Sequence, residues 1–151
     1  MKDALKAAQD SIDQVLLGKS RAVKLALTCI LAKGHLLIED LPGMGKTTLS
    51  QALASVMGMS YQRIQFTSDL LSQGGTFALP ESQLDRFLMR LSLGYPSEKA
   101  EKSLLLGDDR RVRLDRVEAL LNRDELRRLQ SLVPQVNASE ALVDYILRLV
   151  N

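Results

Sequence analysis

The sequence predicts an α/β domain followed by a small all-helical domain, and three observations support this fold class. Residues before 34 have helical periodicity and lead into a short apolar run, Leu36–Ile38. A glycine-rich turn and another helical segment follow that run, and the residues after 97 have helical patterns only. Helix, buried strand, turn and helix in succession are typical of a parallel sheet covered by helices. We place the boundary near Tyr95–Ser97, which divides the chain into residues 1–96 and 97–151.

The first domain is predicted to contain three helices and two strands before residue 67. The first helix ends at Gly18, and Ser20 caps a second helix that Gly34 ends. The helix after the glycine-rich turn starts near Lys46 and ends near Gly58. Gln62–Phe66 then reads as a second strand.

The remainder of the chain is mostly helical in pattern. A short helix is predicted over 80–87, a strand over 89–93, and another helix over 98–106. Further along, Asn122 and Glu125 have the spacing of a capping box at the start of a helix. Either Asn137 or Ser139 caps the last helix.

The composition is that of a globular protein. Hydrophobic residues make up 46% of the chain and charged residues 25%, which excludes a disordered protein. A formal charge of +2 gives no reason to expect a nucleic-acid partner, and Cys29 as the only cysteine permits no internal disulfide. The charged N-terminus has no signal-peptide segment, and no apolar run approaches the roughly 20 residues that span a bilayer. We therefore expect a cytoplasmic protein without a membrane span.

The glycine-rich turn has the features of a loop that binds the phosphates of a nucleotide. Its sequence is Asp40-Leu41-Pro42-Gly43-Met44-Gly45-Lys46-Thr47-Thr48. Gly43 and Gly45 allow backbone N–H groups to approach phosphate oxygens, and the following helix directs its positive end at them. Lys46 can reach the β and γ phosphates, the Thr47 hydroxyl can ligate Mg²⁺, and Thr48 adds a backbone donor. The loop therefore predicts binding of ATP with Mg²⁺.

One position departs from the usual loop pattern, G-x-x-x-x-G-K-[ST]. The first glycine of that pattern is replaced here by Asp40. The surroundings nevertheless fit, because an apolar strand precedes the loop and a helix follows it, as phosphate loops of this kind require.

The chain resembles the MoxR family of AAA+ ATPases over nearly its whole length. The matching stretches are VLLGKSRAVKLALTCILAKGHLLIEDLPGMGKTTL, RIQFTSDLL and GGTFALPESQLDRFLMRLSLGYPS. An acidic residue at the first loop position also occurs in that family. The resemblance implies an α/β nucleotide domain with a helical lid that continues beyond Asn151. It further implies ATP hydrolysis, assembly into a homo-oligomeric, hexameric ring, and chaperone-like remodelling of client proteins, including ones with von Willebrand factor A domains.

Three further residues acquire expected roles from the resemblance. Arg86 matches the position of an arginine finger that reaches the γ phosphate of a neighbouring subunit. Its simpler explanation is an ion pair with Asp85 or Glu81. Leu17 and Gly18, in the stretch Leu17-Gly18-Lys19, match the segment that packs beside the adenine, although Gly18 also ends a helix in either case.

Two groups that hydrolysis needs are missing from the printed residues. A phosphate-loop ATPase requires a second acidic centre for Mg²⁺ and water, which in this family is Asp-Glu after an apolar strand (Walker B). No such strand is present, and the polar sensor strand is missing too. We expect several tens of residues to be absent between Leu71 and Ser72, either left out of the printed sequence or truly deleted from the protein.

Three function classes follow. The first is a ring-forming ATPase and chaperone, the second a nucleotide-binding switch or interaction module without hydrolysis, and the third a DNA-associated AAA+ factor. The basic residues after 109 are interleaved with acidic ones, which favours a solvated face over a nucleic-acid surface.

Overall fold

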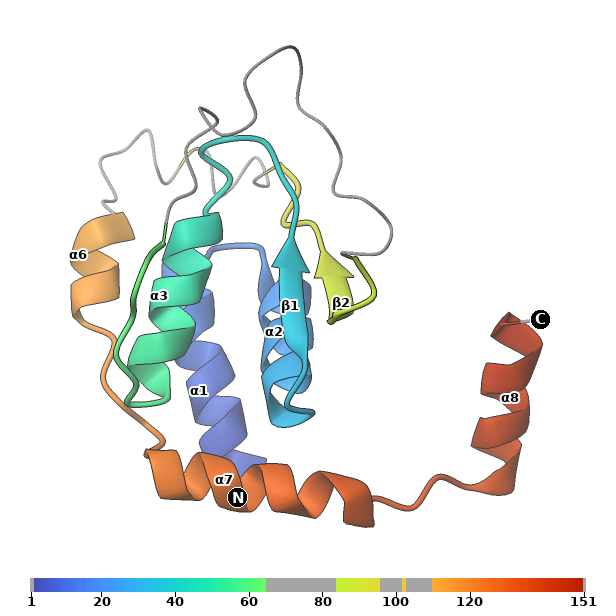
Figure 1. Cartoon of the computed structure of the whole chain (residues 1–151). Coiled ribbons are helices and arrows are strands. Elements are labelled where there is room, and N and C mark those ends of the chain that lie inside the picture. The colour runs from blue at the N-terminus through green and yellow to red at the C-terminus, as the bar shows by residue number, and fades with distance from the viewer. Residues whose placement is uncertain (1, 65–83, 96–101, 103–109, 151) are drawn as a thin grey trace.

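The computed structural model describes residues 2–64, 84–95, 102 and 110–150. The first part contains both helices and strands, and helices alone follow residue 109 among the described residues (Figure 1). The elements are α1 (Lys2–Val15), α2 (Ser20–Leu31), β1 (His35–Ile38), α3 (Lys46–Val56), β2 (Phe87–Leu91), α6 (Arg110–Asp115), α7 (Arg123–Leu132), the 3-10 helix η2 (Val133–Gln135) and α8 (Glu140–Val150). The predicted α/β class is confirmed by this order of elements.

The sheet of the described residues has two parallel strands, β1 and β2. Leu36 pairs with Met89 and Ile38 with Leu91, and these four side chains face the core. Helix α2 contacts both strands, while α1 contacts α2 and α3 (Figure 1). Because β1 runs directly into the glycine-rich loop and α3 directly out of it, the loop lies at the carboxyl edge of the sheet.

The core consists of aliphatic side chains from α1, α2, α3 and the sheet. The absence of tryptophan leaves Leu, Ile, Val, Ala and Met to fill it. The largest side chains that are fully buried belong to Ile12, Val15, Val23, Cys29, Leu49, Val56 and Met57. Cys29 lies among them as a free thiol whose pKa is raised by burial, as is typical of a cysteine that packs in the core.

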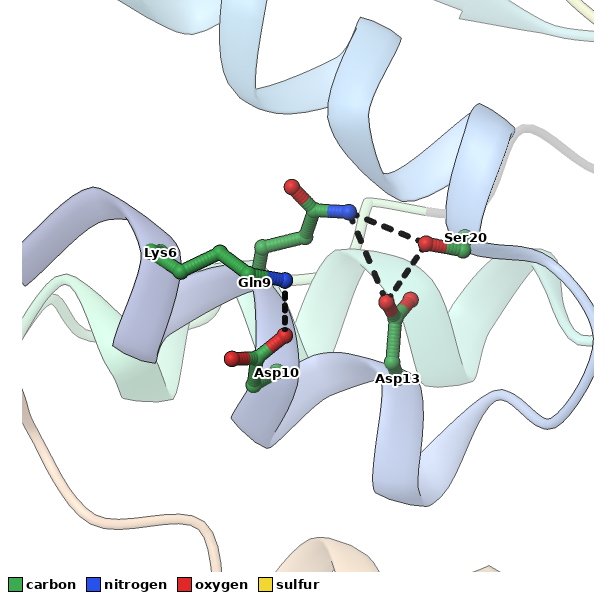
Figure 2. Close-up of polar contacts among 5 residues, drawn as sticks. All are labelled: Lys6, Gln9, Asp10, Asp13 and Ser20. Carbon is green, nitrogen blue, oxygen red and sulfur yellow. Dashed lines mark hydrogen bonds and ion pairs between the residues drawn. The ribbon is translucent and has the colours of Figure 1, made fainter. Parts of the chain in front are cut away.

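The start of α2 differs from the prediction that Ser20 is its cap. Ser20 is the first helical residue, and Lys19 occupies the cap position without a capping side-chain bond. The Ser20 hydroxyl instead donates a hydrogen bond of 2.6 Å to Asp13 on α1, and Gln9 donates one of 2.9 Å to Ser20 (Figure 2). The hydroxyl is therefore used to join two helices rather than to satisfy the N–H groups of its own helix.

The end of α2 also differs in detail. The helix ends at Leu31, three residues before the predicted end at Gly34, and Lys33 has a positive φ of 57°. Gly34 is required for space, because a Cβ atom there would lie 2.3 Å from Cδ2 of Leu88 on β2. The small residue thus permits α2 to turn closely into the sheet.

The second predicted strand is wrong over the residues that can be described. Residues 62–64 form no strand and are exposed, while residues 65 and 66 lie outside the described part. β2 takes the place beside β1 and begins two residues before the predicted 89–93. Of the helix predicted over 80–87, Leu84 is helical and Phe87 belongs to β2, and residues 80–83 are outside the described part, as is nearly all of 98–106.

The helices α6 and α7 pack against the helices of the first part of the chain. Helix α6 contacts α1 and α3, and α7 contacts α2. The backbone N–H groups of Leu120 and Leu121 both donate to the Val56 carbonyl at 2.9 Å, at the end of α3. The predicted boundary near 95–97 includes residues that the structure does not describe, so the division into 1–96 and 97–151 stays a prediction.

The predicted caps of the later helices are found. Asn122 and Glu125 form the expected capping box on α7, with each side chain accepting a backbone N–H of the other residue. At α8, Ser139 rather than Asn137 accepts from Leu142, at 3.3 Å. No helix in the described ranges is both long and apolar enough to cross a membrane.

Candidate phosphate-binding site

The glycine-rich loop has the backbone conformation that the sequence predicts for a phosphate cradle. Gly43 has a φ of 84° and Gly45 a φ of 97°, which are values that residues with a Cβ rarely adopt. Gly45 is the N-cap of α3, so the unpaired N–H groups of the first turn face the loop. A Cβ at Gly43 would meet no atom of the described residues within 4 Å. These features fit an anion of the size of a phosphate group.

Lys46 and Thr47 lie at the first turn of α3. The Lys46 ammonium donates to the carbonyl of Asp40 and, at 2.9 Å, to the carbonyl of Leu41. The side chain therefore folds over the loop that it follows in sequence. Thr47 is exposed and Thr48 half-buried, so the residue predicted to ligate Mg²⁺ is accessible from solvent. The residues at hand fit a nucleotide with its metal ion.

Asp40 makes contacts that a glycine in its place could not make. Its carboxylate accepts hydrogen bonds from the backbone N–H groups of Leu93 and Gly94 and from the Ser92 hydroxyl, the last at 3.1 Å. Burial acts to raise the pKa of Asp40, but these hydrogen bonds and the charge of Lys46 lower it below its ordinary value. Asp40 is therefore a carboxylate at neutral pH, and it ties the start of the loop to the turn after β2.

Lys19 holds the same turn from the other side. Its ammonium donates to the carbonyls of Leu93 at 2.7 Å, Gly94 at 2.8 Å, and Tyr95. Lys19 is only 8% exposed. The resemblance places Lys19 in the segment beside the adenine, but nothing in the sequence indicates that its ammonium binds the turn after β2.

The two residues expected beside the adenine line different pockets. Leu17 lines one of about 310 Å³ together with Arg113 and Arg116 of the segment at α6. Gly18, with a φ of 75°, lines another of about 350 Å³ between α2 and β2, to which Arg90 contributes. Leu17 thus lies between α1 and the segment at α6, while Gly18 faces α2 and β2, so their expected place beside the adenine stays a prediction.

Arg86 lies far from the loop of its own chain. It directly precedes β2, whereas the turn held by Asp40 directly follows that strand. A strand of five residues is roughly 17 Å long, so the two sites are at opposite edges of the sheet. The guanidinium of Arg86 lies 5.6 Å from the centre of the Phe87 ring. Asp85 is exposed beside it, and Glu81 is outside the described residues.

Two pairs of adjacent acidic residues, Asp108-Asp109 and Asp124-Glu125, are the candidates for a second acidic centre, and the residues that can be placed supply none at the loop. Asp124 and Glu125 belong to the first turn of α7, where Glu125 is engaged in the capping box. Asp108 and Asp109 lie outside the described residues. Within the part of the chain that is described, no group of three or more His, Cys, Asp or Glu side chains could hold a metal ion.

Comparison with known proteins gives consistent matches. Residues 35–74, which include the loop, match the family described as ATPases associated with various cellular activities (AAA). YeaC of Bacillus subtilis, described as uncharacterised, is 27% identical over 219 residues, covering 95% of this chain and 68% of that protein. Chaperone MoxR1 of Mycobacterium tuberculosis is 24% identical over 222 residues. A crystal structure of a candidate ATPase from Cytophaga hutchinsonii superposes with a TM-score of 0.77 at 20% identity, covering 98% of this chain and 68% of that one.

The relatives are longer than this chain within the matched region. The alignment with MoxR1 covers 97% of this chain but 58% of MoxR1. The alignment with YeaC spans 219 positions against a chain of 151 residues, so at least 68 of them (219 less 151) have no counterpart here. This excess supports the expectation that several tens of residues are lacking inside the chain. The expected point, between Leu71 and Ser72, lies outside the described residues.

Proposed function

Because this chain belongs to the MoxR family of AAA+ ATPases, we propose that it binds ATP with Mg²⁺ through Asp40–Thr48. The observation that carries the proposal is the loop backbone. Two glycines at positive φ stand ahead of an 11-residue helix, and the lysine of the motif begins that helix. This is the arrangement in which backbone N–H groups and a helix N-terminus together favour a polyphosphate.

The loop residues from Pro42 to Thr48 have separate roles in the proposed complex. Gly43, Met44 and Gly45 present backbone N–H groups to the β phosphate, and Pro42, which has no N–H, fixes the backbone ahead of them. Lys46 leaves the carbonyls of Asp40 and Leu41 and pairs with phosphate oxygens instead. Thr47 offers its hydroxyl to Mg²⁺, which when bound would neutralise phosphate charge, and Thr48 offers a backbone donor. Leu17 and Gly18 are proposed to lie on the side of the base.

Hydrolysis and assembly form the second part of the proposal. We propose that the protein, with the segment that its relatives possess, hydrolyses ATP as a hexameric ring in the cytoplasm. Arg86 then acts on the nucleotide of the neighbouring subunit, because it lies at the sheet edge opposite to its own loop. Chaperone-like remodelling of client proteins, including von Willebrand factor A domain proteins, is proposed by analogy with the family. MoxR1 carries the name chaperone.

A nucleotide-binding switch without hydrolysis is the second candidate. One observation favours it for the printed chain. Among the described residues, the carboxylate at the loop itself, Asp40, binds backbone N–H groups, and Glu125 of the acidic pair Asp124-Glu125 caps α7. A chain that binds nucleotide and lacks a second acidic centre would change its state on binding but would not turn over.

Nucleotide affinity of a Lys46→Ala variant tests the binding proposal. We expect at least about tenfold weaker binding of fluorescent ADP with Mg²⁺, because hydrogen bonds to charged groups contribute roughly 1.5–3 kcal/mol. Lys24→Ala is the matched control, since Lys24 is an exposed lysine on α2. Equal affinity of the two variants would show that another site binds the nucleotide.

Turnover and sedimentation distinguish the two candidates. Phosphate release by the protein encoded with its complete internal segment, abolished by Lys46→Ala, supports the ATPase. Binding without release supports the switch. Ring assembly predicts faster sedimentation when ATP and Mg²⁺ are added, and a monomer under those conditions contradicts it. DNA binding that weakens steeply with salt would instead favour a DNA-associated factor.

A further inference from the structure

The turn that follows β2 is held by two charged side chains from distant parts of the sequence. We call residues Ser92–Tyr95 the β2 turn. Its N–H groups at Leu93 and Gly94 donate to the Asp40 carboxylate. Its carbonyls at Leu93, Gly94 and Tyr95 accept from the Lys19 ammonium. The N–H groups of this short segment are thus bound by a negative charge, and its carbonyl groups by a positive charge.

The burial of Lys19 requires these contacts. A buried ammonium is unfavourable unless its donors are satisfied, and an ammonium has three of them. The three carbonyls of the β2 turn supply three acceptors in one place. Asp40 is complementary, because a carboxylate can accept several N–H bonds at once and holds them more strongly than a neutral side chain would. The turn is therefore fixed more firmly than an ordinary strand end.

Both charged residues belong to segments assigned to the nucleotide. Lys19 directly follows Leu17 and Gly18, which are proposed to lie beside the base. Asp40 is the first residue of the phosphate loop, and its own carbonyl accepts from Lys46. Lys19 and Asp40 are 21 positions apart in the sequence (40 less 19). A single turn therefore links the segment at the base to the loop at the phosphates.

We propose that Lys19 and Asp40 are positioning residues that clamp the β2 turn and thereby fix the phosphate loop relative to the Leu17–Gly18 segment. The proposal rests on the proposed nucleotide binding and explains why a carboxylate replaces the glycine of the usual loop pattern. Glycine at position 40 could not accept the N–H groups of Leu93 and Gly94. Among the described residues, the phosphate loop would then be joined to β2 through β1 and the contacts of Glu39 with Leu91 and Arg90.

The test measures nucleotide affinity and folding separately. Lys19→Met and Asp40→Ala remove the two halves of the clamp, and Glu39→Gln is the control because Glu39 is the adjacent carboxylate, paired with Arg90. Thermal unfolding gives the folded fraction, and titration with fluorescent ADP and Mg²⁺ gives the dissociation constant of the folded protein. We expect each clamp variant to bind at least about fivefold more weakly than the control.

The double variant tests whether the two residues act through one turn. If they do, Lys19→Met with Asp40→Ala weakens binding by less than the product of the single effects, because the turn is already released by either change. Independent effects that multiply would overturn the shared clamp. A purely structural role would lower the melting temperature and leave the affinity of the folded protein equal to that of the control, which also overturns it.

Conservative variants keep the test decisive if the larger changes prevent folding. Asp40→Asn retains one acceptor but presents an NH₂ group to the N–H groups of the turn. The nucleotide affinity of this variant should therefore fall by at least about threefold, and the amide proton resonances of Leu93 and Gly94 should shift upfield. Lys19→Arg should recover part of the affinity lost in Lys19→Met. Unchanged affinity and unchanged resonances in Asp40→Asn contradict the clamp.

Failure of the clamp can be told apart from failure of the proposed function. Binding that depends on Lys46 but not on Lys19 or Asp40 overturns the clamp alone. Binding that is indifferent to Lys46 overturns the assignment of the loop. A wild-type protein that binds no nucleotide overturns both.

Discussion

Helices α1 and α8 have similar amphipathic patterns but very different surroundings. In α1, Ile12 is completely buried and packs in the core with α2 and α3. In α8 no residue is buried, and Ile146 remains 48% exposed. Figure 1 shows α8 standing apart from the other helices at the end of an extended segment. Periodicity therefore predicts a helix in both cases, but only a facing apolar surface decides whether the helix contributes to the core.

The largest expected effect compares the same substitution in the two helices. Ile12→Ala should lower the free energy of unfolding by about 2–5 kcal/mol, because it removes a fully buried side chain and leaves a cavity. Ile146→Ala should change it by less than about 0.5 kcal/mol. Urea unfolding followed by circular dichroism measures both values. A large loss in Ile146→Ala would mean that α8 is packed against another surface in solution and would break the comparison.

A second prediction concerns the junction between α3 and the later helices. Gly58 has a φ of 59°, and a Cβ there would lie 2.9 Å from the Leu121 carbonyl oxygen. Gly58→Ala should therefore destabilise the protein by more than the roughly 1–2 kcal/mol expected from a left-handed backbone alone. Gly43→Ala is the reference, since Gly43 has a φ of 84° with open space around it. Equal melting temperatures of the two variants would show that the backbone near Gly58 and Leu121 can shift to accommodate the added Cβ.

The smallest effects are expected at the helix caps. Asn122→Ala removes the capping box of α7 and should reduce stability by about 1 kcal/mol, because α7 buries Leu126 and Leu129. Ser139→Ala removes the corresponding bond at α8 and should change global unfolding by only about a few tenths of a kcal/mol, since the fraying of an unpacked helix is local. Chemical denaturation of both variants side by side checks the difference. A larger loss for Ser139→Ala would contradict the view of α8 as an unpacked helix.

Local features of the fold are predictable from the sequence and long-range ones are not. The start of α3 at Lys46 and the capping box of α7 follow from residues a few positions apart, and both predictions are confirmed. The pairing of β1 with β2 joins residues that are far apart in the chain. The sequence pattern predicts a strand at 89–93 and another at 62–66, and nothing in it shows which of the two lies beside β1. Local pattern likewise assigns Ser20 to its own helix, because nothing nearby indicates its bond to Asp13.

The same distinction applies to the candidate site. The conformations of Gly43 and Gly45 are predictable, because the motif has few alternatives. The contacts of Asp40 with Leu93 and of Lys19 with the β2 turn span 53 and 74 to 76 positions. The one signal in the sequence is Asp40, which stands where the usual loop pattern has glycine. It indicates that this position differs from the pattern, but it does not indicate which residues Asp40 contacts.

The two hydrogen bonds at the end of α3 have a mechanical consequence. This helix begins at the phosphate loop and ends at the Val56 carbonyl, which holds the N–H groups of Leu120 and Leu121. Its 11 residues form a stiff rod of about 16 Å. A small tilt of the rod at its loop end must displace the chain just ahead of α7, unless both hydrogen bonds break. A shift of the phosphate loop would therefore be transmitted through α3 to the start of α7.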